Sequence, residues 1–295
     1  MQYSCDSFSH SNIWPDQKIA PEVAPARIEE VSNYVTQALG DLQTNTKDQR
    51  YASARKATSD LQNNDLNSDI TSSELVYGEL SVPVLARLFN AVGIKQNEKI
   101  LDVGSGDGGL VFGSSLLLAG LHKDEERNAL GKCNYVQKVT GLEIVPGLYE
   151  RSIQFGKEFR GLISRKKTFW KDESMLDNDS DSIADFEFRL GDIYQTHEDA
   201  LLQEIIQDTT LVICFATTWS AGNANSNNGS KISLQKRNLP KLSSALSYLP
   251  KGARAVIVDG KLDCDKDGFR WGGDLRIECP DTAPYSVASL YEKIS

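Results

Sequence analysis

A glycine-rich stretch that directly follows a short apolar segment constrains the fold of this chain most. Residues 99–103 suit a buried strand, and the chain then continues Gly104-Ser105-Gly106-Asp107-Gly108-Gly109. Residues 110–121 are apolar nearly all round, which indicates a buried helix behind that strand. Glycines permit a tight turn in which a ligand lies against the backbone, and N–H groups at the helix start point at that ligand. The stretch therefore predicts a strand–turn–helix unit with a ligand site at the turn.

Strands and helices alternate along the rest of the chain. We predict strands at 99–103, 139–143, 186–190, 211–215 and 254–259, and helices at 82–92, 110–121, 146–163, 198–207 and 239–249. Such alternation is typical of a parallel sheet with helices on both faces. Residues 271–278 and 286–293 suit two strands without a helix between them, as in an antiparallel hairpin at the sheet edge. The predicted fold class is α/β: a doubly wound, mostly parallel seven-stranded sheet, Rossmann-like, with a C-terminal antiparallel hairpin.

The N-terminal quarter has a different pattern. Apolar residues recur there at helical spacing: Ile28, Val31, Val35, Ala38 and Leu42. Residues 60–73 are rich in Asn, Asp, Ser and Thr, which is typical of a linker. We therefore expect a helical N-terminal extension with its linker at 1–73 and one catalytic or binding domain at 74–295.

Charge and cysteine usage narrow the expected partners. The formal net charge is −9, which disfavours nucleic acid and anionic membranes, so we expect no strong intrinsic nucleic-acid binding. The five cysteines are scattered and form no CxxC pair. This pattern favours a reduced intracellular compartment, nuclear or cytoplasmic, and no metal site. We expect no signal peptide, because residues 1–25 have no basic region followed by an apolar run, and no membrane span, because no window approaches 18 consecutive apolar residues.

Two acids distinguish between the ligand classes that use such a glycine turn. The glycines match the dinucleotide fingerprint GxGxxG. However, Asp102 lies two residues before Gly104, and Asp107 lies inside the turn. A carboxylate there would repel a pyrophosphate. S-adenosylmethionine carries a sulfonium and an ammonium instead, so the D-x-G-x-G-x-G pattern favours this cofactor.

Further candidate ligands follow the next strands. Glu143 ends the second predicted strand and suits the two hydroxyls of a ribose. The spacing from Asp102 to Glu143 is longer than the usual spacing of about 20 residues. We therefore infer an insertion at 122–138. Asp192 follows the third strand and suits an adenine amino group, with Ile193 packed on the ring. Because ligands of open α/β sheets bind outside the carboxyl ends of the strands, these acids are expected to share one site.

The fourth strand leads to the expected methyl-transfer edge. Phe215-Ala216-Thr217-Thr218-Trp219 follows it, and its aromatic residues suit the walls of a narrow slot for the acceptor. The alternative is that Phe215 and Trp219 are ordinary core residues.

The motif Tyr77-Gly78-Glu79 precedes the glycine turn by about 20 residues. Together with the residues above, it resembles the histone-lysine methyltransferases of the disruptor-of-telomeric-silencing type, which lack a SET domain and belong to the class I methyltransferases. The resemblance runs from about residue 77 to 259. It rests on Tyr77, Gly78, Glu79, Asp102, Gly104, Ser105, Gly106, Gly108, Gly141, Glu143, Gly191 and Asp192.

This resemblance implies that the motif, the glycine turn and the strand-end acids bind S-adenosylmethionine, and that a lysine of histone H3 is methylated. Tyr77, Phe215 and Trp219 would then wall the acceptor slot. Glu79 would orient the cofactor or the acceptor, and Thr217 would lie at the transfer edge.

Two other functions stay open. The family usually carries an asparagine pair where this chain has Thr217-Thr218, and its histone work relies on basic segments whereas this chain is acidic. These differences suggest a small-molecule or non-histone protein acceptor. The Asn/Ser-rich stretch at 221–230 leaves open a non-catalytic module that retains the pocket.

Overall fold

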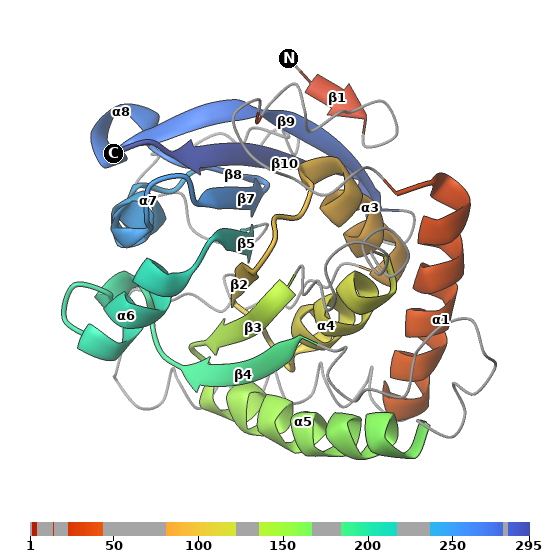
Figure 1. Cartoon of the computed structure of the whole chain (residues 1–295). Coiled ribbons are helices and arrows are strands. Elements are labelled where there is room, and N and C mark those ends of the chain that lie inside the picture. Colours follow the sequence, from red (N-terminus) through yellow and green to blue (C-terminus); the bar gives the residue numbers. More distant parts are fainter. Residues whose placement is uncertain are drawn as a thin grey trace.

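The computed structural model describes residues 2–4, 14, 23–43, 81–121, 136–166, 184–216, 237–279 and 283–295. Its centre is an eight-stranded sheet with strand order β1-β9-β10-β7-β5-β2-β3-β4 (Figure 1). The strands are β1 (Gln2–Ser4), β2 (Glu98–Val103), β3 (Val136–Glu143), β4 (Asp185–Leu190), β5 (Leu211–Phe215), β7 (Arg254–Val258), β9 (Phe269–Cys279) and β10 (Ala283–Lys293). Two short strands, β6 (Arg237–Asn238) and β8 (Gly260–Lys261), pair separately.

Strand directions confirm the predicted fold class. The strands β2, β3, β4, β5 and β7 are mutually parallel, and β10 runs antiparallel to both β7 and β9. All seven predicted strands therefore lie in one sheet. The eighth, β1, pairs with β9 in parallel and comes from the segment expected to be helical.

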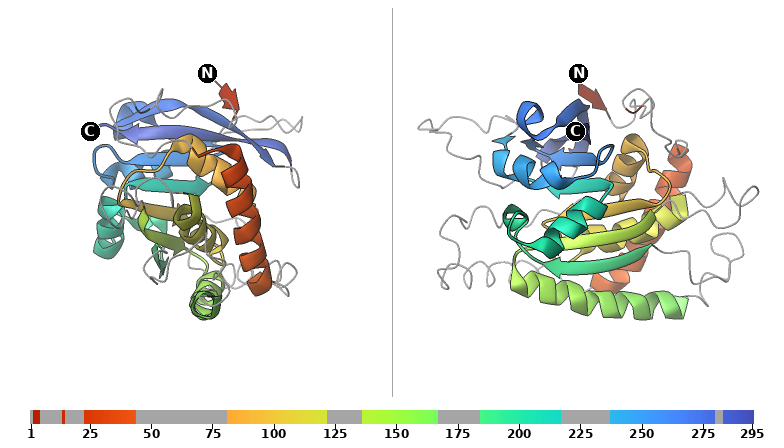
Figure 2. Two further views of the ribbon diagram at one scale, coloured as in Figure 1. Left: turned by 45° about the vertical axis from the view of Figure 1, so that its right-hand side comes forward. Right: turned by 60° about the vertical axis from the view of Figure 1, so that its left-hand side comes forward.

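Helices cover both faces of the sheet (Figures 1 and 2). They are α1 (Pro25–Gln43), α3 (Val82–Val92), α4 (Gly109–Leu121), α5 (Pro146–Lys166), α6 (Ala200–Asp208), α7 (Pro240–Ala245) and α8 (Cys264–Asp267). One core joins the sheet to α1, α3, α4 and α5, and a second core joins the other face to α6 and α7. Within the described ranges, no helix combines the length and apolarity needed to cross a bilayer.

The helix α1 packs directly on the rest of the molecule. Its apolar stripe, including Val31, Val35 and Leu39, is buried in the same core as α3 and α4. This explains why α4 is apolar nearly all round: it lies between the sheet and a second layer of helix. The linker expected at 60–73 lies outside the described residues, and the domain boundary stays a prediction.

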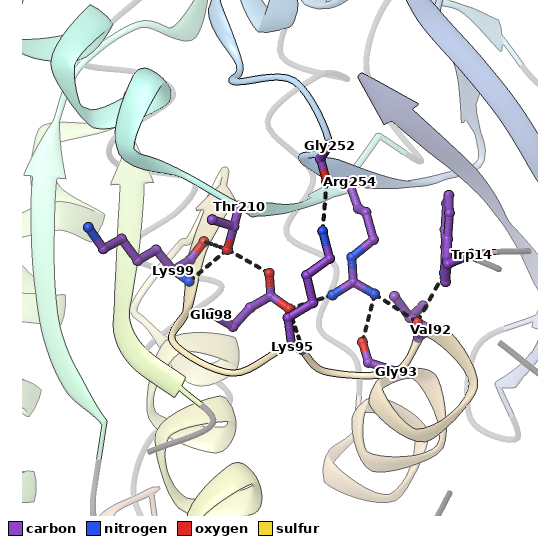
Figure 3. A network of polar contacts seen from close by, with 9 residues as sticks. All are labelled: Trp14, Val92, Gly93, Lys95, Glu98, Lys99, Thr210, Gly252 and Arg254. Atoms are coloured by element: carbon purple, nitrogen blue, oxygen red, sulfur yellow. Dashed lines mark hydrogen bonds and ion pairs between the residues drawn. The ribbon is translucent and has the colours of Figure 1, made fainter. Parts of the chain in front are cut away.

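A buried ion pair lies at the amino ends of the central strands (Figure 3). Arg254, which begins β7, pairs with Glu98, which begins β2, and both side chains are fully buried. The Arg254 guanidinium also donates to the carbonyl oxygens of Val92 and Gly93, each at 2.9 Å. These carbonyls end α3, where a cation interacts favourably with the helix dipole. The pair therefore fastens α3 to the sheet.

Neighbouring groups complete this network. Thr210, just before β5, donates to Glu98 Oε1 at 2.5 Å, and the indole of Trp14 donates to Val92 O at 3.2 Å. Lys95 donates through its backbone N–H to Glu98 Oε2 at 2.8 Å and through Nζ to Gly252 O at 2.7 Å. Burial and the charge of Arg254 lower the pKa of Lys95 to about 8.

The lowered pKa of Lys95 predicts a pH dependence of stability. Between pH 8 and the ordinary lysine pKa of 10.5, the unfolded chain binds more protons at this residue than the folded chain does. This residue's contribution to the free energy of unfolding therefore rises with pH across that window. We expect urea unfolding from pH 7 to 9.5 to show wild type gaining stability relative to Lys95→Met. A stability difference that is the same at every pH would contradict this.

Candidate functional site

Those predicted ligand residues that the structure describes lie at one edge of the sheet. Strand order reverses between β2 and β5, since the chain continues from β2 to β3 on one side and returns to β5 on the other. Open α/β sheets bind ligands at such a switch point, outside the carboxyl ends of the strands. Asp102, Glu143, Asp192 and Phe215 all lie at this edge. The buried ion pair of Figure 3 lies at the opposite edge.

The glycine turn connects β2 to α4 and is tied to β3. The N–H groups of Gly104 and Ser105 both donate to Leu142 O, at 2.9 and 3.0 Å. The φ angles of Gly104, Gly106 and Gly108 are +81°, +58° and +94°. L-residues with side chains rarely adopt these values, so the turn depends on glycine.

Close packing adds a second requirement for glycine. A Cβ on Gly108 would lie 2.6 Å from Cζ of Phe188 and 2.8 Å from the Phe112 ring. A Cβ on Gly141 would lie 2.8 Å from Oγ of Ser105. The Ser105 side chain therefore packs against β3, and its hydroxyl has no hydrogen-bond partner among the described residues. Its predicted cofactor role stays a prediction.

Glu143 bridges the glycine turn and the start of α5. Its Oε2 accepts from the N–H of Gly106 at 2.6 Å, and its Oε1 accepts from the N–H of Val145 at 2.9 Å. Burial raises the pKa of Glu143, the backbone donors lower it, and the charge of Asp107 raises it further. A carboxylate has about four lone-pair directions. The N–H groups of Gly106, Val145 and Ile144 use part of this capacity, and the ribose-binding role of Glu143 stays a prediction.

The turn also carries two other buried carboxylates. Asp102 and Asp107 are 4% and 2% exposed. Asp102 lies on β2 between Gly141 and Ile213 of the neighbouring strands, and its charge adds to burial in raising the pKa of Cys214. Together with Glu143, these acids make the turn unfavourable for a phosphate and suitable for a cation or for hydroxyl donors.

Asp192 and Ile193 follow β4. Asp192 Oδ1 accepts from the N–H of Tyr194 at 2.9 Å and so caps the short 3-10 helix Ile193–Gln195. Burial raises the pKa of Asp192, while the Tyr194 N–H and the charge of Lys241 lower it. Ile193 is buried.

Sequence reasoning missed Ile144, which follows Glu143 and packs with Val145 and Leu148 in a small apolar cluster. In the sheet register, Glu143 at the end of β3 pairs with Leu190 at the end of β4. Ile144 therefore lies close to where the chain leaves β4 towards Asp192. Ile144, which is half-buried, and Ile193, which is buried in the second core, thus follow neighbouring strand ends. The available signal was an apolar residue directly after a strand-end acid.

The acceptor edge is described only in part. Phe215 ends β5 half-buried, and the N–H of Ala216 donates to Val258 O at 3.0 Å. Tyr77, Gly78, Glu79, Thr217 and Trp219 lie outside the described residues. The aromatic slot therefore stays a prediction.

Sequence reasoning also missed Asp259, which follows β7 at this edge with φ +58°. Its own N–H donates to Val287 O at 2.8 Å, and its Oδ1 accepts from the N–H of Val287 at 2.9 Å. In this second bond the side-chain oxygen takes the role that a backbone carbonyl has in a regular antiparallel pair. The chain thereby leaves the sheet to form β8. The Asp-Gly dipeptide was the available signal.

Comparison with known proteins gives one family match. Residues 56–176 match the family described as histone methylation protein DOT1, which is less than half of the chain. None of the curated proteins compared matches the sequence significantly.

Similar solved structures are distant. An RNA methyltransferase from Salinibacter ruber in complex with S-adenosyl-L-homocysteine has 16% identity and a TM-score of 0.37, with 74% of this chain and 95% of that chain covered. A putative RNA methyltransferase from Pyrococcus horikoshii has 13% identity and a TM-score of 0.41, with 82% and 98% covered. At these scores the similarity says nothing about the substrate. The family match, the fold and the strand-end acids support a class I S-adenosylmethionine-dependent methyltransferase.

Proposed function

We propose that this chain is an S-adenosylmethionine-dependent protein-lysine methyltransferase whose favoured acceptor is a lysine of histone H3. The observation that carries the cofactor is the buried Glu143 carboxylate, bonded to the N–H of Gly106 inside the glycine turn. Two less specific observations support the acceptor: the family match at 56–176 and the Tyr77-Gly78-Glu79 motif within it.

The residues present fit the cofactor. Glu143 can accept from the ribose hydroxyls, and Asp192 can accept from the adenine amino group while Ile144 and Ile193 pack on the ring. The glycine turn lets the cofactor approach the backbone, and its carboxylates favour a cationic ligand. A dinucleotide fits less well, because its pyrophosphate would meet Asp102 and Asp107.

When bound, the cofactor would supply a methyl group on a sulfonium: an acceptor lone pair would attack the methyl carbon in line, and the sulfur would leave as the neutral thioether of S-adenosylhomocysteine. The chain must hold that lone pair about 3 Å from the methyl carbon, and such positioning supplies much of the rate. A lysine must first lose its proton. A dry slot walled by Tyr77, Phe215 and Trp219 would lower the amine pKa by desolvation, so a dedicated base is not required.

Net charge supports a basic acceptor. With a formal net charge of −9, the chain should associate faster with a basic histone than with a neutral protein, and DNA should repel it. We therefore expect free histone to be methylated at least as well as nucleosomes. The scattered cysteines support the proposal of a nuclear or cytoplasmic location.

Another acceptor is favoured by one observation, the Thr217-Thr218 pair where the family usually has two asparagines. A small molecule or a non-histone protein would then replace the histone. A non-catalytic S-adenosylmethionine-binding module is the least favoured possibility, because the strand-end acids are intact.

Labelled methyl transfer tests the acceptor. The full chain should be incubated with methyl-labelled cofactor and, separately, with free histone H3, nucleosomes and a cell extract. We expect label on histone lysines, and Trp219→Ala should reduce turnover more than cofactor affinity. Label found only on small molecules would contradict the lysine acceptor and leave the methyltransferase class intact. A chain that binds cofactor without transferring label to any extract component would support the binding module.

A further inference from the structure

A second contact joins the glycine turn to a neighbouring element, as the hydrogen bond from Gly106 to Glu143 does. Asp107, inside the glycine turn, lies with its Oδ2 3.9 Å from Nε of Arg151 on α5. The Asp107 side chain is almost fully buried, and that of Arg151 is 14% exposed. The guanidinium also lies over the Phe155 ring, 5.2 Å from its centroid, which restricts its position. The pair therefore joins α5 to the turn where Glu143 already joins β3 to it.

Charge balance makes this contact functional as well as structural. Among the described residues, the charged groups on the segments that meet near Glu143 are Asp102 and Asp107 from β2 and the turn, Arg151 from α5, and Asp192 after β4. Asp107 is the one that acts on the pKa of Glu143, and it raises that pKa. Arg151, the cation among these four groups, lies against Asp107. Its charge opposes that of Asp107, which adds to burial in raising the pKa of Glu143.

We propose that Arg151 is a positioning residue of the cofactor site, which offsets the charge of Asp107 so that Glu143 binds the ribose hydroxyls as a carboxylate. This inference rests on the proposed S-adenosylmethionine site. It predicts that the pH at which the protein gains cofactor affinity depends on Arg151 and Asp107 in opposite directions.

The test is the dissociation constant of S-adenosylhomocysteine, measured by calorimetry from pH 5.5 to 8.5. For Arg151→Met, we expect the pH at which the protein gains affinity to move upward, so that affinity is below wild type at the acid end of this range and recovers as pH rises. Asp107→Asn should hold its affinity to lower pH than wild type. The double variant should return towards the wild-type profile, and Lys157→Met, which removes an exposed cation from the same helix, should match wild type.

Urea unfolding of each variant separates loss of folding from loss of charge balance. If Arg151→Met lowers affinity equally at every pH and Asp107→Asn does not restore it, the contact is only structural and the proposal is wrong. An unchanged Arg151→Met profile also overturns it. If wild type does not bind the probe at any pH, the failure lies with the proposed cofactor instead.

Discussion

Replacing Arg254 with methionine should lower the free energy of unfolding by about 3–5 kcal/mol, the usual cost of removing one partner of a buried ion pair. The change leaves the fully buried Glu98 carboxylate without its cation. It also removes the donor to Val92 O and Gly93 O, which end α3. Urea unfolding of both proteins at pH 7 measures the difference.

The double variant Glu98→Gln/Arg254→Met is the matched control. A neutral amide can still accept from Thr210 and leaves no buried charge, so the double variant should have a higher free energy of unfolding than Arg254→Met alone. Affinity for S-adenosylhomocysteine should change little in folded protein, because this network lies at the edge opposite the glycine turn. A loss below about 1 kcal/mol in the single variant would show that the pair contributes no more than an exposed ion pair does.

Replacing Gly108 with alanine should cost about 2–5 kcal/mol of stability. The left-handed conformation of this residue costs a side-chain-bearing residue about 1–2 kcal/mol. The new methyl group would also press on Phe188 and Phe112, and overpacking costs about 1–3 kcal/mol more. Because Gly108 leads into α4, cofactor affinity should fall with stability.

Two other glycines separate these causes. Gly252 has φ +82° and nothing within 4 Å of an added Cβ, so Gly252→Ala should show the conformational cost alone. Gly40 lies in helix α1 with open space around it, so Gly40→Ala should stabilise the protein by up to about 1 kcal/mol. Equal losses for Gly108→Ala and Gly252→Ala would contradict the packing argument.

Much of this fold follows from local patterns. The apolar strands β2 and β3 are each followed directly by a helix of ordinary length, α4 and α5, so a parallel sheet could be predicted. Strand β1 could not, because three residues carry too little alternation to be recognised. The pairing of Glu98 with Arg254 could not either, since 156 positions separate the two residues and only the folded sheet brings their strand starts together.

The site residues also divide into those that local sequence patterns predict and those that only the folded chain brings together. Asp102, Glu143 and Asp192 could be placed together because parallel strands end at a common edge. Arg151 could not, because nothing in an exposed-looking helix pattern indicates that one of its cations turns towards a buried acid. Asp259 was missed because an Asp-Gly pair indicates a turn without indicating which backbone group its carboxylate replaces.

Calorimetric titration with S-adenosylhomocysteine and with NAD tests the central claim most directly. We predict that wild type binds the adenosyl compound and does not bind NAD. Glu143→Ala should weaken binding by about 1–3 kcal/mol, through loss of hydrogen bonds to a charged acceptor. Tight binding of NAD, with no binding of S-adenosylmethionine or S-adenosylhomocysteine, would contradict the methyltransferase assignment.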